Sequence, residues 1–479
     1  MKKAINEYLS LFRISKEQIE SLTAEALSGG GDWCDLFFED STFGELVLRD
    51  SEVSSGGLHI DYGCGIRVLK GEKTGYAYAE STEYPALLAA ARSASAIASA
   101  DLSLSKLNYA ACPKPQKQVS NFCPMASDWR VSPAGNFADC LNKLEALIRA
   151  KDCRVHKVIA SLSWQVSEIL MYNTLEGFTG ETRPLGSLAV TVVFIQNGCT
   201  EVNNSSLSFR SGTEMISDSL LEELAADVTR GMDERFEARR PSGGKMPVVM
   251  AAGASGILLH EAMGHAFEAD FIRKGQSIFS DKMGKRVAAK GINIIDDATI
   301  SGNRGSLNYD DEGVAGQKTY MVKDGILNCF LHDRISAAFF GVSPTGNGRR
   351  ESFRYNPIPR MRCTYMESAP GNTSCEDLIS EVRKGIFVDQ FSNGEVKIGE
   401  GDFTFYVKSG RLIENGRLTM PVKDINIVGN GPKALADIVA VASDLKIDNG
   451  GWTCGKEQSV PVGCGIPSIL IKSLTVGGE

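Results

Sequence analysis

Several features that commonly reveal the class of a protein are scarce or missing in this sequence. No stretch approaches about 18 uninterrupted apolar residues, so we expect no transmembrane helix. Basic residues number 51 against 59 acidic ones, and no basic patch or stripe is present, which argues against binding to nucleic acid. The twelve cysteines include no CxxC pair, and Glu7 interrupts the apolar run that a signal peptide would need. We therefore expect a cytoplasmic protein with reduced thiols and no membrane association.

Histidine is also scarce, with 5 among 479 residues, but two of them belong to a His-Glu-Ala-Met-Gly-His string at residues 260–265. A His-Glu-x-x-x-His string occurs by chance in roughly 0.3% of such chains. Two imidazoles and a carboxylate suit a Zn²⁺ ion that keeps one position open for water. We interpret His260 and His265 as metal ligands and Glu261 as the general base. The alternative is a buried helix whose histidines are merely hydrogen-bonded core groups.

The spacing of the two histidines predicts a distorted helix. Five residues of a regular α-helix rotate about 500°, which leaves the two side chains roughly 140° apart. A single π-type turn, closed by an i→i+5 hydrogen bond, brings them to one face, and Gly264 supplies the backbone freedom for it. We predict a strand at 246–252, a turn at 253–256 with Ser255 as N-cap, and then a helix to about residue 271.

The length of the chain requires more than one hydrophobic core. Apolar periodicity and turn residues predict helices at 1–28, 83–100, 135–151, 217–236 and 432–445, strands that include 35–39, 45–48, 65–69, 158–162 and 188–195, a connector at 102–134, and a linker at 237–244. Asp324-Gly325 and Asn415-Gly416 predict hairpin turns in a largely antiparallel last unit.

No parallel βαβ order is apparent, so we assign the chain to the α+β class. The predicted domains are an N-terminal α+β domain at 1–110, a middle α+β domain at 111–240, and a C-terminal domain at 241–479. The C-terminal domain is expected to be mostly antiparallel β, to be the catalytic domain, and to carry the helix of the His-Glu-x-x-x-His motif.

A catalytic zinc takes three protein ligands, so one ligand remains to be found. Spacing alone does not rank the chemically able side chains, which are Glu268, Asp270, Glu312, Cys329, Cys454 and Cys464. Cys454 lies in a glycine-rich loop with little side-chain bulk, although a loop thiol without a role is the simpler interpretation.

Three other segments near the motif carry candidate groups. The acidic turn at 309–313 fits either a solvated turn or a group that orients the imidazoles. The loop at 344–351 could bind a substrate carboxylate or carbonyl through arginine. His332 could donate a hydrogen bond to an oxyanion, or it could lie on the surface.

The chain resembles the TldD/PmbA family of zinc metallopeptidases, and within it the TldD branch, which carries the HExxxH motif. The resemblance rests on that motif and on the segments 304–308, 310–313, 344–352, 428–432 and 448–456. It implies that His260, His265 and Cys454 hold one Zn²⁺ per chain, with Glu261 as the base. It also implies a dimer around an enclosed cavity, either a homodimer or a heterodimer with a paralogue that lacks the motif. The implied substrate is an unfolded peptide, bound as an extended strand at a sheet edge.

The combined interpretation is a cytoplasmic zinc peptidase that hydrolyses unfolded or extended peptides. Two alternatives stay open: a non-cleaving, peptide-binding subunit with a structural zinc closed by four protein ligands, and a hydrolase of small amides. The same ligands also bind Co²⁺, Ni²⁺ or Fe²⁺, so the sequence does not identify the metal used in the cell.

Overall fold

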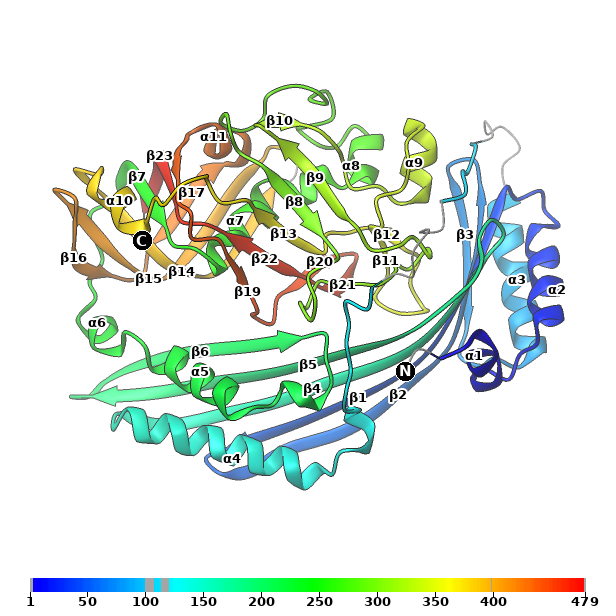
Figure 1. Ribbon diagram of the computed structural model, residues 1–479, viewed down its shortest axis with the longest axis horizontal. Coiled ribbons are helices and arrows are strands. Elements are labelled where there is room, and N and C mark those ends of the chain that lie inside the picture. The colour runs from blue at the N-terminus through cyan, green and yellow to red at the C-terminus, as the bar shows by residue number, and fades with distance from the viewer. Residues whose placement is uncertain (1–2, 100–106, 113–119, 398, 478–479) are drawn as a thin grey trace.

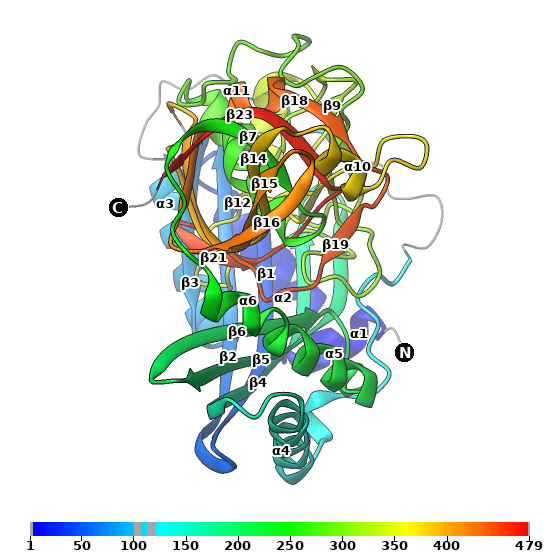
Figure 2. The same cartoon turned by 90° about the vertical axis from the view of Figure 1, so that its left-hand side faces the viewer.

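The computed structural model of the chain describes residues 3–99, 107–112, 120–397 and 399–477. It has two parts (Figure 1). A long curved sheet carries helices on its outer face, and a second body, built around two further sheets, lies against its inner face. Figure 2 shows the same arrangement from the side, with the second body above the sheet and helix α4 (Ala134–Lys151) below it.

The N-terminal part is one antiparallel sheet with the strand order β3-β2-β1-β4-β5-β6. Its strands are β1 Trp33–Arg49, β2 Glu52–Lys70, β3 Lys73–Ala79, β4 Val155–Asn173, β5 Gly177–Gln196 and β6 Cys199–Phe209. Strand β1 comes before the connector predicted at 102–134 and strand β4 comes after it, and the two are hydrogen-bonded neighbours. Strands from both sides of residue 110 therefore share one sheet. Residues 100–106 and 113–119 of that region lie outside the described residues. The domain boundaries at 110 and 240 stay predictions.

The strand segments predicted at 35–39 and 45–48 are parts of the single strand β1. The polar residues between them interrupt the apolar pattern without ending the strand. Ser41, for example, is fully buried and contacts the side chains of Glu39 and Ser167, so its hydroxyl finds polar partners inside the protein.

Helices cover the outer face of this sheet in two groups. The first group is α1 Ile5–Leu11, α2 Lys16–Leu27 and α3 Tyr84–Ser99, and the second is α4 and α5 Asp218–Thr229, with short 3-10 helices at Trp129–Val131 and Thr213–Met215. Helix α6 Met232–Glu237 follows α5 and leads from edge strand β6 toward the C-terminal part. Each group closes its own hydrophobic cluster against the strands, with Ile19, Leu22 and Leu87 in one and Leu141 and Leu224 in the other. The prediction of helices at 83–100 and 135–151 is confirmed.

Two predicted helices are broken in the structure. The helix expected at 1–28 stops before Arg13, whose φ of 51° is left-handed, and restarts at the N-cap Ser15, which exchanges capping hydrogen bonds with Gln18. The helix expected at 217–236 is interrupted at Gly231, whose φ is 68°. Periodicity alone did not reveal these breaks, because the apolar pattern continues across them.

The C-terminal part contains two main sheets. One has the strands β7 Gly244–Met250, β14 Lys384–Lys397, β15 Asp402–Glu414, β16 Arg417–Val422, β17 Asn426–Asn430, β18 Ile438–Val441 and β23 Ile469–Gly477. The other has β8 Ile294–Asp297, β9 Lys318–Lys323, β10 Ile326–Leu327, β13 Cys363–Met366, β19 Lys446–Asp448 and β22 Gly463–Ile466. Two short ladders join β11 Gly348–Arg349 to β12 Ile358–Pro359 and β20 Thr453–Lys456 to β21 Gln458–Pro461.

The helices of this part are short: α7 Ile257–Leu259, α8 Ala269–Arg273, α9 Arg334–Phe340, α10 Cys375–Ser380 and α11 Gly431–Ala436. The helix predicted at 432–445 is therefore too long, because the chain turns after α11 into β18, which pairs with β23. Most strand pairs are antiparallel, with β7–β14 and β13–β22 parallel. The chain is an α+β protein, as predicted.

Both hairpin predictions are confirmed. Asp324 and Gly325 have φ values of 49° and 74°, and Asn415 and Gly416 have φ values of 51° and 74°, which is the geometry that lets a two-residue turn match the twist of its strands. None of the helices in the described part of the chain has the length and apolar character needed to span a bilayer.

Candidate metal centre

The motif helix starts from strand β7 and is irregular where the histidines lie. After α7, residues His260–Gly264 form a π turn in which the backbone N–H of His265 donates to the carbonyl of His260. This is the i→i+5 bond that the spacing predicts, and the prediction is confirmed. Ser255 is not the N-cap, because Gly253 precedes a short 3-10 helix at Ala254–Gly256 and the buried Ser255 hydroxyl has no partner among the described residues.

The π turn brings both imidazoles to one buried thiol. The Nε2 atom of His260 lies 3.2 Å from Cys454 Sγ, and the Nε2 atom of His265 lies 3.3 Å from the same sulfur. The two rings meet at 86°, with centroids 5.0 Å apart. All three donor atoms lie within 4.8 Å of one another, and bonds of about 2.0–2.3 Å to a single zinc ion require donor spacings of this order. The donor set therefore fits zinc in chemistry and in spacing.

Cys454 is held in place by the short hairpin β20–β21 and by one arginine. The fully buried Arg360 donates hydrogen bonds to the carbonyl oxygens of Cys454, at 2.5 Å, and of Gln458, at 2.8 Å. A guanidinium fixes both strands of the hairpin in this way, and the sulfur position does not depend on the loop alone.

Glu268 does not join the donor group but supports it. Its Oε2 lies 3.0 Å from His265 Nδ1, so the imidazole can donate its Nδ1 proton and keep Nε2 free for a metal. The same oxygen lies 3.0 Å from Lys456 Nζ, and Lys456 also donates to Asp270 at 2.8 Å. Lys456 follows Cys454 by two residues on β20, and this period-2 spacing is the sequence signal that could have linked the two.

The charges of the site favour a thiolate. Burial alone would raise the pKa of the Cys454 thiol, but the charge and hydrogen bonds of His260 and His265 outweigh it and lower this pKa to about 4. Burial would likewise raise the pKa of Glu268, but Lys456 and His265 lower it to about 2. Burial would lower the pKa of the two imidazoles, but the Cys454 thiolate and Glu268 in turn outweigh it and raise this pKa. Metals bind a thiolate and neutral imidazoles, so zinc binding would release the ring protons that face the sulfur.

Glu261 stands beside this group without joining it. Its side chain is half-buried, and burial raises the pKa of its carboxyl group, while the charges of His260 and His265 oppose that shift. Its carboxylate is therefore electrostatically coupled to the donor atoms, and no hydrogen bond to another described residue ties it down.

The remaining ligand candidates lie elsewhere. Glu312 pairs with Arg67, Cys329 Sγ donates to the carbonyl of Phe330, and Cys464 is buried in β22. Neither these three nor Asp270 belongs to a described group of converging metal donors.

The interpretation of the acidic turn as solvated is wrong. Asp310, Asp311 and Glu312 are each at most 2% exposed. Arginines from distant segments compensate their charge: Arg183 pairs with Asp311, and Arg67 pairs with Glu312 at 2.8 Å. The turn joins the two parts of the molecule, and in the described part of the chain none of its side chains is hydrogen-bonded to the imidazoles.

The arginines of the polar loop and His332 are also buried inside the protein. Arg349 and Arg350 of the polar loop are buried and donate to backbone carbonyls, such as Arg349 to Met361 at 2.6 Å. His332 is buried, which excludes the surface position, one of its two interpretations, and burial lowers its pKa to about 4. At neutral pH it is an uncharged imidazole.

We expect Glu268→Ala to weaken zinc binding about 10–100-fold, because His265 loses the acceptor that fixes its ring and tautomer. Glu268→Gln keeps an acceptor at the same place and should lose less. Competition with a chromophoric chelator measures both affinities. An unchanged affinity in Glu268→Ala would show that the Glu268–His265 contact does not support the metal site.

We expect Gly264→Val to weaken zinc binding and to lower the melting temperature. A Cβ at position 264 would lie 2.1 Å from Met361 Sδ, so the π turn has no room for a branched side chain. Overpacking of this kind costs about 1–3 kcal/mol, more than the helix propensity gained by losing a glycine. The second substitution Met361→Ala should restore part of both losses. Unchanged zinc affinity and melting temperature in Gly264→Val would contradict this account.

Comparisons with known proteins find a matching family and related chains. Residues 243–478 match the family described as PmbA/TldA metallopeptidase C-terminal domain, and residues 34–98 match PmbA/TldA metallopeptidase domain 1. A protein of Haemophilus influenzae named metalloprotease TldD homolog is 38% identical over 458 residues, which are 93% of each chain.

Two solved structures have the same fold. One, from Thermotoga maritima, is described as a candidate modulator of a DNA gyrase and has a TM-score of 0.76 and 22% identity over 96% of this chain and 100% of that one. The other, TldE from Thermococcus kodakarensis, has a TM-score of 0.71 and 19% identity over the same shares, 96% and 100%. At these identities the likeness extends to the fold alone.

Proposed function

The chain belongs to the PmbA/TldD family of metallopeptidases, and from this premise we propose that it is a zinc-dependent peptidase acting on unfolded or extended peptides. The observation that carries the proposal is the convergence of His260 Nε2, His265 Nε2 and Cys454 Sγ beside the carboxylate of Glu261, which is coupled to their charges. Zinc held by these three donors would supply Lewis acidity, which acidifies water and polarises a scissile carbonyl.

Three residues of the chain carry out the other steps or hold the ligands in place. Glu261 accepts the proton of the attacking water and later delivers it to the leaving amine. The pKa of Glu261 is raised by burial, which brings its basicity closer to the working pH. Glu268 keeps His265 in the tautomer that exposes Nε2. Arg360 holds the backbone of Cys454, so that its sulfur stays close to both Nε2 atoms.

Two observations favour this function over its alternatives. Among the described residues only three donors converge, whereas a structural zinc needs four protein ligands. Strand β3 pairs with β2 from Cys64 onward, so in the described chain the first half of β2 offers a free backbone edge on which an extended peptide could add a strand. A hydrolase of small amides has no use for such an edge.

We further propose that the enzyme works in the cytoplasm as a dimer, either with itself or with a paralogue that lacks the motif. All twelve cysteines are free thiols, which suits a reducing compartment. The dimer follows from the family resemblance, and light scattering on the purified chain, alone and with a candidate paralogue, tests it.

One experiment separates the three functions. The zinc-loaded protein is incubated with reduced and alkylated ribonuclease, with native ribonuclease, and with an amino-acid p-nitroanilide, and the products are identified by mass spectrometry. Cleavage of the unfolded protein alone supports the peptidase. Tight binding without cleavage supports a binding subunit, and release of nitroaniline alone supports a small-amide hydrolase.

A further inference from the structure

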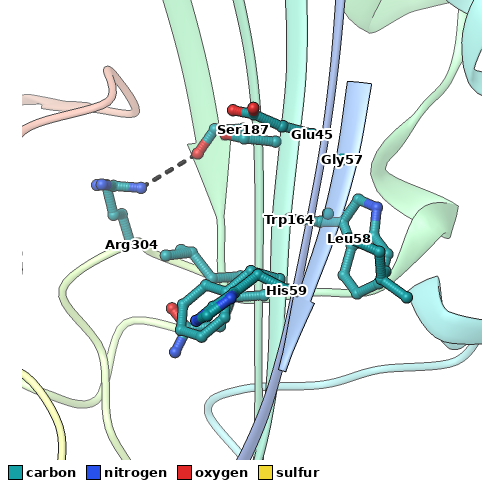
Figure 3. A pocket seen from close by; sticks show the side chains of 12 residues that line it. Glu45, Gly57, Leu58, His59, Trp164, Ser187 and Arg304 are labelled. Atoms are coloured by element: carbon teal, nitrogen blue, oxygen red, sulfur yellow. Dashed lines mark hydrogen bonds between the residues drawn. The ribbon is translucent and has the colours of Figure 1, made fainter. Parts of the chain in front are cut away.

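A cavity of about 390 Å³ lies on the inner face of the N-terminal sheet, where the sheet approaches the C-terminal part. Four adjacent strands, β2, β1, β4 and β5, line it, and Arg304 from the C-terminal part completes its wall. Figure 3 shows the Arg304 guanidinium reaching across toward Ser187 on β5. The metal centre uses none of these residues.

The strand register sorts the floor of the cavity into two rows. Phe43 lies opposite His59 on one side and opposite Gln165 on the other, and the rings of Phe43 and His59 are 5.9 Å apart. The next row on the same face runs from Glu45 through Ser163 to Ser187. The cavity thus has an aromatic row and a polar row, and Arg304 stands at the hydroxyl end of the polar row.

Arg304 is fixed in position by four hydrogen bonds. Its Nε donates to the carbonyl of Trp452 at 2.8 Å, and its Nη1 donates to the hydroxyls of Ser208 at 2.7 Å and Ser187 at 3.1 Å. Its Nη2 donates to the hydroxyl of Thr453 at 3.1 Å. Among the described residues it pairs with no carboxylate, and a guanidinium has five N–H groups, so one N–H of Arg304 is still available.

Neighbouring groups make this end of the cavity positive. Arg210 donates to the carbonyl of Arg304, and burial lowers the pKa of both guanidinium groups, that of Arg304 to about 10. Arg304 remains charged at neutral pH. Glu45, the acidic side chain of the cavity, is exposed and lies two strands from Ser187, which is about 10 Å, so water and salt screen it from Arg304.

We propose that Arg304 forms an anion-binding subsite of the peptide cleft and binds a substrate carboxylate, from either an acidic side chain or a free C-terminus. The proposal rests on the peptidase function, because Arg304 touches Trp452 and Thr453, the two residues directly before Cys454. Among the described groups at the Arg304 guanidinium, its free N–H and the hydroxyl proton of Thr453 can donate to the carboxylate. A charged group held there places the peptide in a fixed register against the metal centre.

Four versions of one fluorescein-labelled decapeptide of glycine, serine and alanine test the proposal. Each carries a single internal Glu or Gln and has a free or an amidated C-terminus. Fluorescence anisotropy measures their binding to the zinc-loaded Glu261→Gln variant, which leaves the probe intact. We expect a carboxylate to tighten binding about tenfold or more, as charge-assisted hydrogen bonds do. Whether the internal Glu or the free C-terminus gives this gain identifies the source.

The variant Arg304→Gln should bind all four peptides with the weaker affinity, whereas Arg92→Gln, which removes an exposed arginine on α3, should retain the preference. Equal affinity for the four peptides, no binding of any of them, or a preference that persists in Arg304→Gln would overturn the proposal. Zinc content and circular dichroism show whether Arg304→Gln folds. If it does not, the affinities of the four peptides for the Glu261→Gln variant still test the proposal.

The same peptides keep this inference distinct from the proposed function. Digestion by the wild-type protein without any carboxylate preference in binding would support the peptidase and overturn the subsite. Carboxylate-dependent binding that Arg304→Gln abolishes, without digestion by the wild type, would support the subsite and contradict the peptidase.

Discussion

Replacing Glu261 with Gln is expected to slow peptide hydrolysis by roughly 10²–10⁴-fold while the protein keeps its zinc and its fold. Gln has the same shape but accepts no proton, and Glu261 is not among the three converging donor atoms. The half-buried side chain also carries no hydrogen bond to another described residue that the change would break. Initial rates on an unfolded substrate, read together with zinc content, measure the effect.

The comparison with Glu268→Ala separates a lost base from a lost metal. In Glu268→Ala the rate should fall with metal occupancy and recover when Zn²⁺ is added in excess, because the base is intact. In Glu261→Gln added Zn²⁺ should restore nothing. A wild-type rate in Glu261→Gln, at full zinc occupancy, would remove Glu261 from the mechanism.

The local geometry of the metal centre could be predicted because it depends on residues close in sequence. The i, i+5 spacing of His260 and His265 is compatible with one metal only if the helix is distorted, and Gly264 marks the place. The structure contains that π turn. The same local logic predicted the two hairpins, where Asp-Gly and Asn-Gly pairs take up left-handed backbone conformations.

Cys454 could not be chosen from spacing, because it lies 189 residues from His265. Its position depends on Arg360 and Lys456, whose contacts arise only when distant strands have packed. The family resemblance, which compares whole motifs, pointed to Cys454, and the structure places its sulfur against both imidazoles.

The acidic turn was misjudged for a related reason. Three successive acidic residues at 310–312 are typical of a solvated turn, unless arginine or lysine side chains from distant segments pair with them inside the protein. Here Arg67 comes from β2 and Arg183 from β5, more than a hundred residues earlier in the chain. Sequence patterns record the preference of a segment for water, but not the partners that tertiary structure brings to it.

Loss of a metal ligand is the second large effect we expect. Wild-type protein should bind about one zinc per chain, and Cys454→Ser or His265→Ala should lower the affinity by more than the 10–100-fold expected for Glu268→Ala, because each removes a direct bond to the metal. Elemental analysis after dialysis and chelator competition measure the stoichiometry and the affinity.

Thermal unfolding gives a second measure of the same loss that does not depend on catalysis. A metal that binds only the folded chain stabilises it by about 2.7 kcal/mol at a free concentration 100 times its Kd, so a chelator should lower the melting temperature of the wild type. It should leave that of Cys454→Ser nearly unchanged, because little metal remains to be removed. The control Cys329→Ser removes a half-buried thiol outside the donor group and should behave like the wild type. Full zinc occupancy and a wild-type response to chelator in both Cys454→Ser and His265→Ala would mean that the three converging atoms are not the metal site.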